Sequence, residues 1–401
     1  MNGDTLKSSE FSGSATEVAR QISLLDPDYR TRLMASGFEP RKLLQLAGTI
    51  DGSADAAARR EARNRVDGEV RAPLPEEILS APMPDSPDER QLAAIGEAAI
   101  RRGELAFCVM AGGMATRMGG VVKALVEAFD GHTFLDLRLA ENATVSARAG
   151  RPVPLWLMTS DATDGPIRAE LGKKKAPAHV KTFTQDLSLR LTPEGHLFIG
   201  ADGLPSAHAT GHGDLPDALR RSGLLTRFRA EGGRYVWIAN LDNLGASIDP
   251  AILGAFIATD KEMMVEVCDK VKGDRGGIPV HARGRLQVLE EFRLPKTFDA
   301  SSVTVFNTNT FLVRASALED TQIAWTYFEV EKKVEGKLAI QFERLLQELT
   351  AAVPAAYMRV PRDDDASRFL PVKDNEELEA RRSTIESVAR KRGMVPAGKT
   401  A

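Results

Sequence analysis

A short apolar run followed by a glycine-rich loop constrains this chain more than any other feature. The run, LAFCVM, begins at Leu105, and the loop that follows it is AGGMATRMGGVVK. A continuous apolar run that ends at glycines is typical of a buried strand in a parallel sheet. Gly112 and Gly113 would let backbone N–H groups approach a phosphate closely, because glycine has no Cβ. Arg117 and Lys123 add positive charge, so the loop predicts a polyphosphate site.

The spacing of these glycines differs from that of two common phosphate loops. It matches neither the G-x-G-x-x-G pattern of dinucleotide-binding folds nor the G-x-x-x-x-G-K-[ST] pattern of P-loop NTPases. The sequence therefore predicts a phosphate loop of another kind.

Strands and helices are expected to alternate after this loop. Apolar runs predict strands at 153–159, 180–184, 235–240 and 263–268. Helical spacing fits residues 135–149, 163–172, 214–230, 250–258 and 375–392. Alternation of this kind favours a mostly parallel sheet covered by helices on both faces. Two later strands, near 285–291 and 303–313, suggest an inserted antiparallel subsheet.

The N-terminal part of the chain differs from its centre. Residues 16–72 have helical patterns, and the proline-rich stretch 72–87 is interpreted as a linker. Ser86 begins a capping box with proline at the first helical position. We expect the helix that starts there to end at Gly103.

The composition excludes several classes of function. A formal charge of −3 over 401 residues gives no overall field that favours nucleic acid or a membrane surface. No apolar run is long enough to cross a bilayer, and the first residues lack the apolar core of a signal peptide. Cys108 and Cys268 lie in predicted strands and are interpreted as buried hydrophobes, not as a disulfide or metal pair. A cytoplasmic location is expected.

Five further segments are candidate binding loops, because ligands of parallel α/β sheets bind beyond the carboxyl ends of the strands. They are GHGD at 211–214, NLDNLG at 240–245, GG at 276–277, FNTN at 306–309 and SRFLPVK at 367–373. In the first, His212 could donate to a phosphate or a hydroxyl group, and a plain turn capped by Asp214 is the alternative. In the second, Asp242 is well placed to hold a divalent metal, and an ordinary Asp/Asn turn is the alternative.

Amide and lysine side chains characterise the last two segments. Asn307 and Asn309 would share one side of a strand and suit the hydroxyls of a sugar, although buried structural amides fit equally well. Lys373 follows an apolar stretch and a proline, which suits nucleotidyl transfer, whereas most lysines are simply solvated. The acidic run 363–365 is interpreted as a solvated loop. His196, His208 and His212 lack the spacing of a zinc site.

Together these segments resemble the UTP–glucose-1-phosphate uridylyltransferase family (UDP-glucose pyrophosphorylases). The similarity extends from about Leu105 to Leu378. The motifs that carry it follow the family's order: AGGMATRMGG, HTFLDL, PLWLMTS, TFTQ, GHGD, SGLL, LDNLGASID, FNTNT, IQFE and SRFLPVK. GHGD, LDNLGASID and FNTNT are more similar to the glucose-1-phosphate enzymes than to the related N-acetylhexosamine pyrophosphorylases.

The resemblance implies a Rossmann-like α/β nucleotidyltransferase core with a helical N-terminal region, without the C-terminal left-handed β-helix of the eukaryotic members. The implied domains are a helical region over 1–100, a catalytic domain over 101–375 and a C-terminal helix and tail over 376–401. It also implies a reaction in which glucose 1-phosphate attacks the α-phosphorus of UTP with Mg²⁺, giving UDP-glucose and pyrophosphate. UTP and a sugar 1-phosphate would be the ligands, and a monomer or dimer the assembly. A UDP-sugar or UDP-N-acetylhexosamine pyrophosphorylase and a non-catalytic sugar-nucleotide-binding protein are the alternatives.

Residue roles also follow from the resemblance. The implied catalytic cations are Lys123, Lys373 and Arg117. The implied nucleotide-binding residues are Gly112, Gly113, Gln185 (at the uracil edge) and Gly211. The implied residues for the sugar phosphate are His212, Gly277, Glu290, Asn309 and Glu343. The implied metal ligand is Asp242.

Two residues depart from the family's pattern. Ala115 stands where the family usually has glycine, and Val122 stands where it has a proline before the lysine. A methyl group at Ala115 would crowd the phosphates if that residue required a positive φ.

Overall fold

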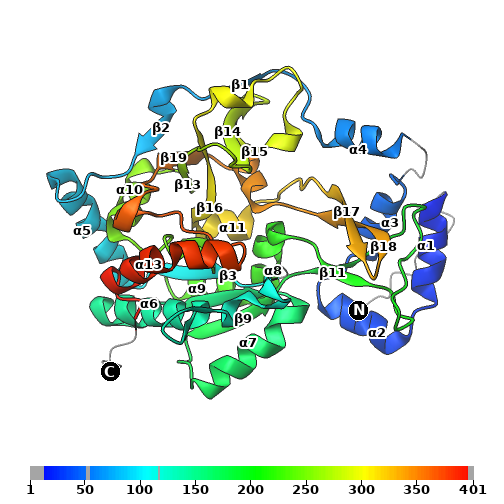
Figure 1. The fold of residues 1–401 in the computed structure, drawn as a ribbon, viewed down its shortest axis with the longest axis horizontal. Helices are drawn as coiled ribbons and strands as arrows, with labels where there is room; N and C mark the ends of the chain where they lie inside the picture. Colours follow the sequence, from blue (N-terminus) through cyan, green and yellow to red (C-terminus); the bar gives the residue numbers. More distant parts are fainter. Residues whose placement is uncertain (1–12, 51–54, 116–117, 396–401) are drawn as a thin grey trace. The chain divides into compact units, whose positions relative to one another are not determined.

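Figure 1 shows the elements of the chain, for which a computed structural model describes residues 13–50, 55–115 and 118–395. The chain divides into two compact units. The larger one, called here the α/β unit, comprises residues 67–183, 219–323 and 347–401. The smaller one, called the small unit, comprises residues 1–66, 184–218 and 324–346. Arg117, one of the implied catalytic cations, lies outside the described residues.

An eight-stranded sheet forms the centre of the α/β unit. Its strands, in order across the sheet, are β2 (Ile78–Ser80), β19 (Ala355–Arg359), β13 (Met263–Asp269), β16 (Val305–Arg314), β12 (Tyr235–Asn240), β3 (Leu105–Met110), β8 (Leu155–Thr159) and β9 (Val180–Thr184). β16 is antiparallel to β12 and β13, whereas the pairs β12–β3, β3–β8, β13–β19 and β19–β2 are parallel. The expectation of a mostly parallel α/β sheet is confirmed, and the opening apolar run is β3, which is buried throughout.

Most helices lie close to the predicted ranges. The helices are α1 (Ser14–Ser23), α2 (Pro27–Ala35), α3 (Pro40–Ala47), α4 (Ala56–Asn64), α5 (Pro87–Arg102), α6 (Phe134–Ala149), α7 (Asp161–Lys173), α8 (Leu215–Ser222), α9 (Leu224–Ala230), α10 (Pro250–Thr259), α11 (Ala315–Asp320), α12 (Leu349–Ala352) and α13 (Asn375–Lys391). Of these, α11 and α12 were not predicted. α5 begins where predicted, because Ser86 Oγ accepts a hydrogen bond from the N–H of Glu89 at 3.0 Å. The expected capping box is incomplete, since the Glu89 carboxylate accepts from the N–H of Asp85 at 3.1 Å and not from that of Ser86. It ends at Gly103, whose φ of 79° suits glycine. The single helix predicted over 214–230 is two helices, because Gly223 has a φ of 73° and separates α8 from α9.

The expected antiparallel subsheet is present, but one of its two predicted strands is not part of it. The strand near 285–291 is β15 (Arg285–Glu290), which pairs with β14 (Gly277–Ala282) in an antiparallel three-stranded sheet with β1 (Val70–Arg71). The strand predicted near 303–313 lies instead in the main sheet as β16, where it is buried along most of its length. The proline-rich stretch is more than a linker, since β2 within it pairs with β19.

Helices and two β-hairpins make up the small unit. β10 (Leu187–Leu189) pairs with β11 (Ala207–Ala209), and β17 (Phe328–Val334) pairs with β18 (Lys337–Glu343). The apolar faces of α1 and α3 pack with these strands in one core, which includes Val18, Ile22, Leu43, Leu44, Leu189, Ile340 and Phe342. The hairpins thus bring three sequence segments of the small unit into a single hydrophobic core.

The chain after Lys373 forms α13, whose first turn is capped by Asp374. No left-handed β-helix is present in the ranges that the structure describes. Within the same ranges, none of the helices combines the length and the apolar character that crossing a bilayer requires.

Candidate active site

The phosphate loop after β3 is held by a short hairpin in the α/β unit. β4 (Met114–Ala115) pairs with β5 (Val121–Val122), and the N–H of Lys123 donates to the Gly113 carbonyl at 3.2 Å. A Cβ on Gly113 would have no neighbour within 4 Å, so the backbone there borders open space. Ser160 Oγ donates to the Gly112 carbonyl at 2.9 Å and fixes the start of the loop.

Ala115 does not strain this loop. It lies in β4, paired with Val121, and strand residues have a negative φ. Its side chain is buried. The condition under which its methyl group would crowd a phosphate is therefore not met.

Lys123 and Asp242 are in direct contact. Lys123 follows the loop after β3, and Asp242 follows β12, the parallel neighbour of β3. The Lys123 Nζ atom lies 2.6 Å from Asp242 Oδ2, and the two side chains are 18% and 15% exposed. The carboxyl edge of two adjacent strands thus carries both the lysine implied for the phosphates and the carboxylate implied for the metal.

Arg138, on α6, holds the loop that carries Asp242. It is fully buried and donates to the carbonyls of Asn240 at 3.1 Å and Asn243 at 2.6 Å. Its charge is balanced by Glu141, 2.7 Å away and one turn along the helix. Glu141 in turn accepts from the N–H of Ile248 at 2.8 Å, so both ends of the loop are tied to α6.

A second set of contacts joins this loop to the segment that ends at Lys373. Asn243 Nδ2 donates to the Arg368 carbonyl at 3.1 Å, and Asn243 Oδ1 accepts from the N–H of Leu370 at 2.7 Å. The N–H of Val372 donates to Asp242 Oδ2 at 3.4 Å. Lys373, the next residue, is exposed. The structure therefore brings Lys373 beside the loop of Asp242.

Gly277 and Glu290 face each other across β14 and β15. A Cβ on Gly277 would lie 2.6 Å from Val288 Cγ1 and 3.2 Å from Glu290 Oε1, so a larger residue does not fit. Gln347 Nε2 donates a short hydrogen bond to Glu290 Oε1. Burial raises the pKa of Glu290 to about 7, and the negative charge of Glu291 adds to the shift.

Asn309 lies in a β-bulge of β16, which interrupts the regular alternation expected for Asn307 and Asn309. Glu266 of β13 pairs with Thr310, and the next residue of β13 pairs with Asn307. Residues 308 and 309 of β16 are therefore the additional residues that form the bulge. Asn309 has a φ of 61°, and its N–H donates to Asn307 Oδ1 at 2.9 Å. Its Nδ2 donates to Asn240 Oδ1 at 3.1 Å, at the end of β12. The bulge thus places Asn309 near the start of the Asp242 loop.

The small unit brings together Gln185, Gly211 and His212. Gln185 Nε2 donates to the Gly211 carbonyl at 2.8 Å. His212 Nδ1 accepts from the N–H of Leu346 at 3.1 Å, which leaves the proton of a neutral imidazole on Nε2. Burial lowers the pKa of His212 to about 4, so it is neutral at pH 7 and can donate from Nε2.

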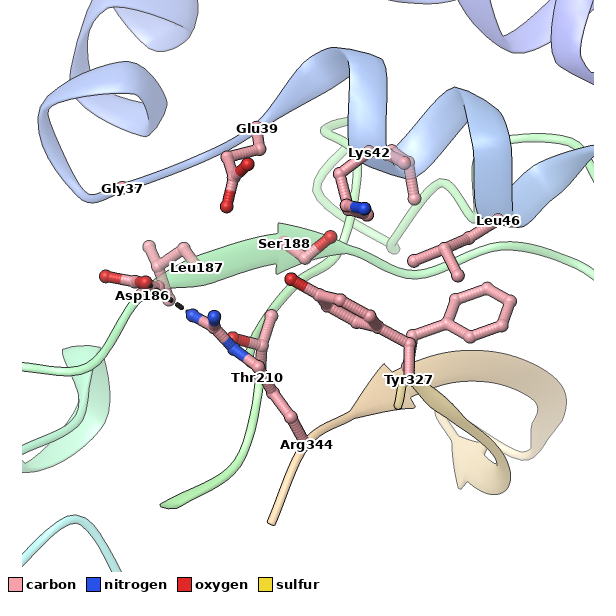
Figure 2. Close-up of a pocket in the computed structure, with 12 residues that line it drawn as sticks. Gly37, Glu39, Lys42, Leu46, Asp186, Leu187, Ser188, Thr210, Tyr327 and Arg344 are labelled. Carbon is pink, nitrogen blue, oxygen red and sulfur yellow. Dashed lines mark hydrogen bonds and ion pairs between the residues drawn. The ribbon is translucent and has the colours of Figure 1, made fainter. Parts of the chain in front are cut away.

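Glu343 lies at the end of β18 in the same unit. Its Oε1 accepts from Gln341 Nε2 at 2.5 Å and lies 3.7 Å from Lys332 Nζ. The next residue, Arg344, is buried and forms an ion pair with Asp186, which Figure 2 shows as a dashed line.

The sequence analysis missed the buried polar residues that hold the candidate site in place. They are Arg138, Glu141, Arg344 and Gln347. The only signal for the first two was a charged pair at helical i, i+3 spacing within an apolar helix. Among the described residues, no group of three or more His, Cys, Asp or Glu residues could hold a metal ion.

Comparison with known proteins assigns the family. A profile of UTP–glucose-1-phosphate uridylyltransferase matches residues 64–397. The potato protein of that name is 32% identical over 282 residues, which are 67% of this chain and 58% of the potato protein. The Saccharomyces cerevisiae protein of the same name is 31% identical over 296 residues, 69% of this chain and 58% of the yeast protein. The chain therefore spans less than two thirds of the length of these curated relatives.

Solved structures agree on the fold. The UDP-glucose phosphorylase of Trypanosoma brucei has a TM-score of 0.70 at 22% identity, and the superposition covers 88% of this chain and 77% of the T. brucei chain. The uridine diphosphate N-acetylglucosamine pyrophosphorylase of the same organism has a TM-score of 0.70 at 21% identity, and the superposition covers 94% of this chain and 82% of that protein's chain. With the profile match extending over most of the sequence, this chain belongs to the UTP–glucose-1-phosphate uridylyltransferase family.

Proposed function

We propose that this chain is a uridylyltransferase that forms UDP-glucose and pyrophosphate from UTP and glucose 1-phosphate. The observation that carries the proposal is the contact of Lys123 with Asp242 at the end of two adjacent parallel strands, beside a glycine-rich loop. Membership of the family supplies the reaction. Transfer of this kind depends on positioning and on charge stabilisation more than on a protein nucleophile.

In the proposed reaction, an oxygen of the sugar phosphate attacks the α-phosphorus of UTP. The bond from that phosphorus to its bridging oxygen breaks, and pyrophosphate leaves with the electron pair. Lys123 and Lys373 would stabilise the charge that develops on the phosphate oxygens, with the backbone of Gly112 and Gly113 beside them. The two thiols are unsuited to a nucleophilic role, because burial raises the pKa of Cys108 and also that of Cys268, the latter to about 12.

Residues of the small unit would bind the base and the sugar phosphate. Gln185 would read the uracil edge with Gly211 beside it. Neutral His212 would donate from Nε2 to a phosphate oxygen, since its Nδ1 is occupied by the N–H of Leu346. Glu343 would add a carboxylate for the sugar hydroxyls.

Residues of the α/β unit would bind the sugar as well. Gly277 would line the sugar pocket with its backbone, since a Cβ there would meet Val288 and Glu290, and Glu290 and Asn309 offer a carboxyl and an amide to hydroxyl groups.

Asp242 would hold Mg²⁺ in this proposal. In nucleotide-dependent enzymes Mg²⁺ is commonly bound by one or two protein carboxylates together with substrate phosphates, and a lone Asp242 beside a phosphate loop fits that pattern. When bound, the ion would neutralise phosphate charge. We further propose that the protein acts in the cytoplasm as a monomer or dimer, in keeping with its two buried free cysteines.

Pyrophosphate release by the purified chain tests the proposal. The reaction contains UTP and Mg²⁺ with glucose 1-phosphate, galactose 1-phosphate or N-acetylglucosamine 1-phosphate in parallel. Release with glucose 1-phosphate alone is the expected result. Faster release with another sugar would change the assigned substrate, and no release with any of the three would overturn the proposed activity.

A further inference from the structure

We infer that Arg344 is a positioning residue that fixes Gln185 and His212 in one arrangement and thereby sets the preference for uracil over cytosine. The inference rests on the proposed function, in which these two residues bind the base and the sugar phosphate. Each contact that supports it lies within the small unit.

Three carboxylates surround the Arg344 guanidinium. Its Nη2 lies 2.7 Å from Asp186 Oδ2, its Nε lies 2.8 Å from Asp214 Oδ1, and its Nη1 lies 2.6 Å from Asp217 Oδ2. The Arg344 side chain is only 3% exposed. Since every nitrogen of the guanidinium already contacts a carboxylate, Arg344 is not free to bind a substrate phosphate.

These carboxylates belong to the two segments that carry the proposed ligand-binding residues. Asp186 directly follows Gln185, and Asp214 lies two residues after His212. One buried arginine therefore ties the end of the TFTQ segment to the GHGD segment. Without its charge, Asp186 and Asp214 would repel each other in a poorly solvated place.

The backbone around Arg344 holds the GHGD segment as well. The Arg344 carbonyl accepts from the N–H of Gly213 at 3.0 Å, and the Arg344 N–H donates to the Thr210 carbonyl at 2.8 Å. A Cβ on Gly211 would lie 2.5 Å from the Arg344 carbonyl oxygen, and one on Gly213 would lie 2.6 Å from the Arg344 carbonyl carbon. Two residues later, Leu346 donates to His212, so this short segment also sets the tautomer of the imidazole.

Aromatic rings complete the surroundings of the guanidinium. Its central carbon lies 5.5 Å from the ring centre of Trp325 and 5.7 Å from that of Tyr327. Figure 2 shows Arg344, Asp186 and Thr210 along one side of a small hollow, with Lys42 of α3 and Tyr327 further along it. A lysine in place of Arg344 could keep the charge but could not contact three carboxylates through a planar fork.

Orientation of the Gln185 amide links this arrangement to the base. A carbonyl oxygen only accepts hydrogen bonds, so the contact with Gly211 commits one N–H of Nε2, fixes which way the amide points and leaves Oε1 as an acceptor for the base. Uracil presents a donor at N3, whereas N3 of cytosine is an acceptor and is repelled by such an oxygen. If the Gly211 segment loosens, the amide can turn over and the discrimination falls.

The test compares Arg344→Gln and Arg344→Lys with the wild-type chain and with an Arg60→Gln control. Arg60 is also in the small unit, where its ion pairs are with Glu329 and Glu331 and involve neither Gln185 nor His212. Calorimetry measures the affinities for UTP and CTP, and initial rates give kcat and KM for UTP. The expected result for Arg344→Gln is a loss of about tenfold in the UTP-to-CTP affinity ratio, with a raised KM. Arg344→Lys should recover part of the ratio, and Arg60→Gln should retain all of it.

Two results would overturn the inference. One is a wild-type UTP-to-CTP affinity ratio in an Arg344→Gln variant whose thermal transition shows that it is folded. If Arg344→Gln does not fold, a wild-type affinity ratio in Arg344→Lys overturns the inference instead. The other is a wild-type chain that binds UTP and CTP equally. A wild-type chain that binds UTP more tightly than CTP but releases no pyrophosphate would overturn the proposed activity. In that case the UTP-to-CTP affinity ratios of the variants would still decide whether Arg344 is a positioning residue.

Discussion

The ammonium group of Lys123 lies 2.6 Å from the carboxylate of Asp242, although 119 residues separate them in the chain. The contact follows from the parallel pairing of β3 with β12, whose loops leave the same edge of the sheet. Each charge compensates the other in a mostly buried place. A change at either residue therefore affects both the charge balance of the loop and the groups proposed to face the phosphates.

Lys123→Ala is expected to lower turnover with UTP and glucose 1-phosphate by about 10²–10³-fold, because a cation aimed at the phosphates is removed. Initial rates of pyrophosphate release measure the loss. Lys181→Ala removes an exposed lysine of β9 and should retain the wild-type rate. Combining Lys123→Ala with Asp242→Asn should cost less than the sum of the two single losses, since the residues interact. A Lys123→Ala rate close to wild type would contradict the assigned role.

A second prediction concerns Glu290, whose pKa burial raises to about 7. If the ionised carboxylate binds sugar hydroxyls, kcat/KM for glucose 1-phosphate should rise with pH through about 7. Gln347 donates to this carboxylate and favours its charged form, so Gln347→Leu should move the rise to higher pH. The dependence of kcat/KM on pH in Glu290→Gln serves as the reference, because that variant lacks the ionisation of residue 290 and retains those of the sugar phosphate and of the other groups. Superimposable profiles for wild type and Glu290→Gln would contradict the prediction.

Local patterns in the sequence predicted the central strands and the loops that carry Lys123 and Asp242. The apolar runs became β3, β8, β12 and β13, and binding loops were expected beyond the carboxyl ends of such strands. The direct contact of Lys123 with Asp242 was not predicted, because it depends on β3 and β12 being neighbours in the sheet. Gly103 ended its helix as expected, since a glycine with positive φ is a local stop signal.

Partners of buried charges could not be predicted in the same way. Arg138 and Arg344 act on segments distant in sequence, and neither apolar periodicity nor motif spacing indicates which carboxylates or carbonyls a buried arginine will find. The position of β16 was missed for a similar reason, because its antiparallel pairing with β12 and β13 depends on long-range contacts. The bulge at Asn309 likewise appears only once β13 is paired with it.

A third prediction concerns the stability of the fold at mildly acidic pH. Burial lowers the pKa of His212 to about 4, well below that of an exposed histidine, so the unfolded chain binds the proton more readily. The stability that the neutral imidazole contributes is present above about pH 6.5 and is lost as the pH falls toward 4. For this one group, the loss between about pH 7 and 5 is about 2 kcal/mol.

Urea unfolding at the two pH values measures this loss in the wild type and in His212→Asn. The pKa of His208 is likewise lowered by burial to about 4, and His208 keeps its own contribution in both proteins. The pH-dependent loss should therefore be smaller in His212→Asn but not absent. Equal losses in the two proteins would show that His212 takes up its proton as readily in the folded state as in the unfolded one.

The last prediction concerns Gly245, in the loop that carries Asp242. A Cβ there would lie 2.6 Å from the Arg368 carbonyl carbon, and backbone atoms cannot give way as a flexible side chain can. Gly245→Ala should therefore cost about 1–3 kcal/mol of unfolding free energy and lower turnover, because the segment that leads to Lys373 is pushed from the Asp242 loop. Gly172→Ala is the matched control: Gly172 lies within α7, and its added methyl group meets nothing within 4 Å. Its turnover should be unchanged and its stability the same or up to about 1 kcal/mol higher, since alanine favours a helix. If Gly245→Ala matches Gly172→Ala in both measurements, close packing of the two loops does not control the site.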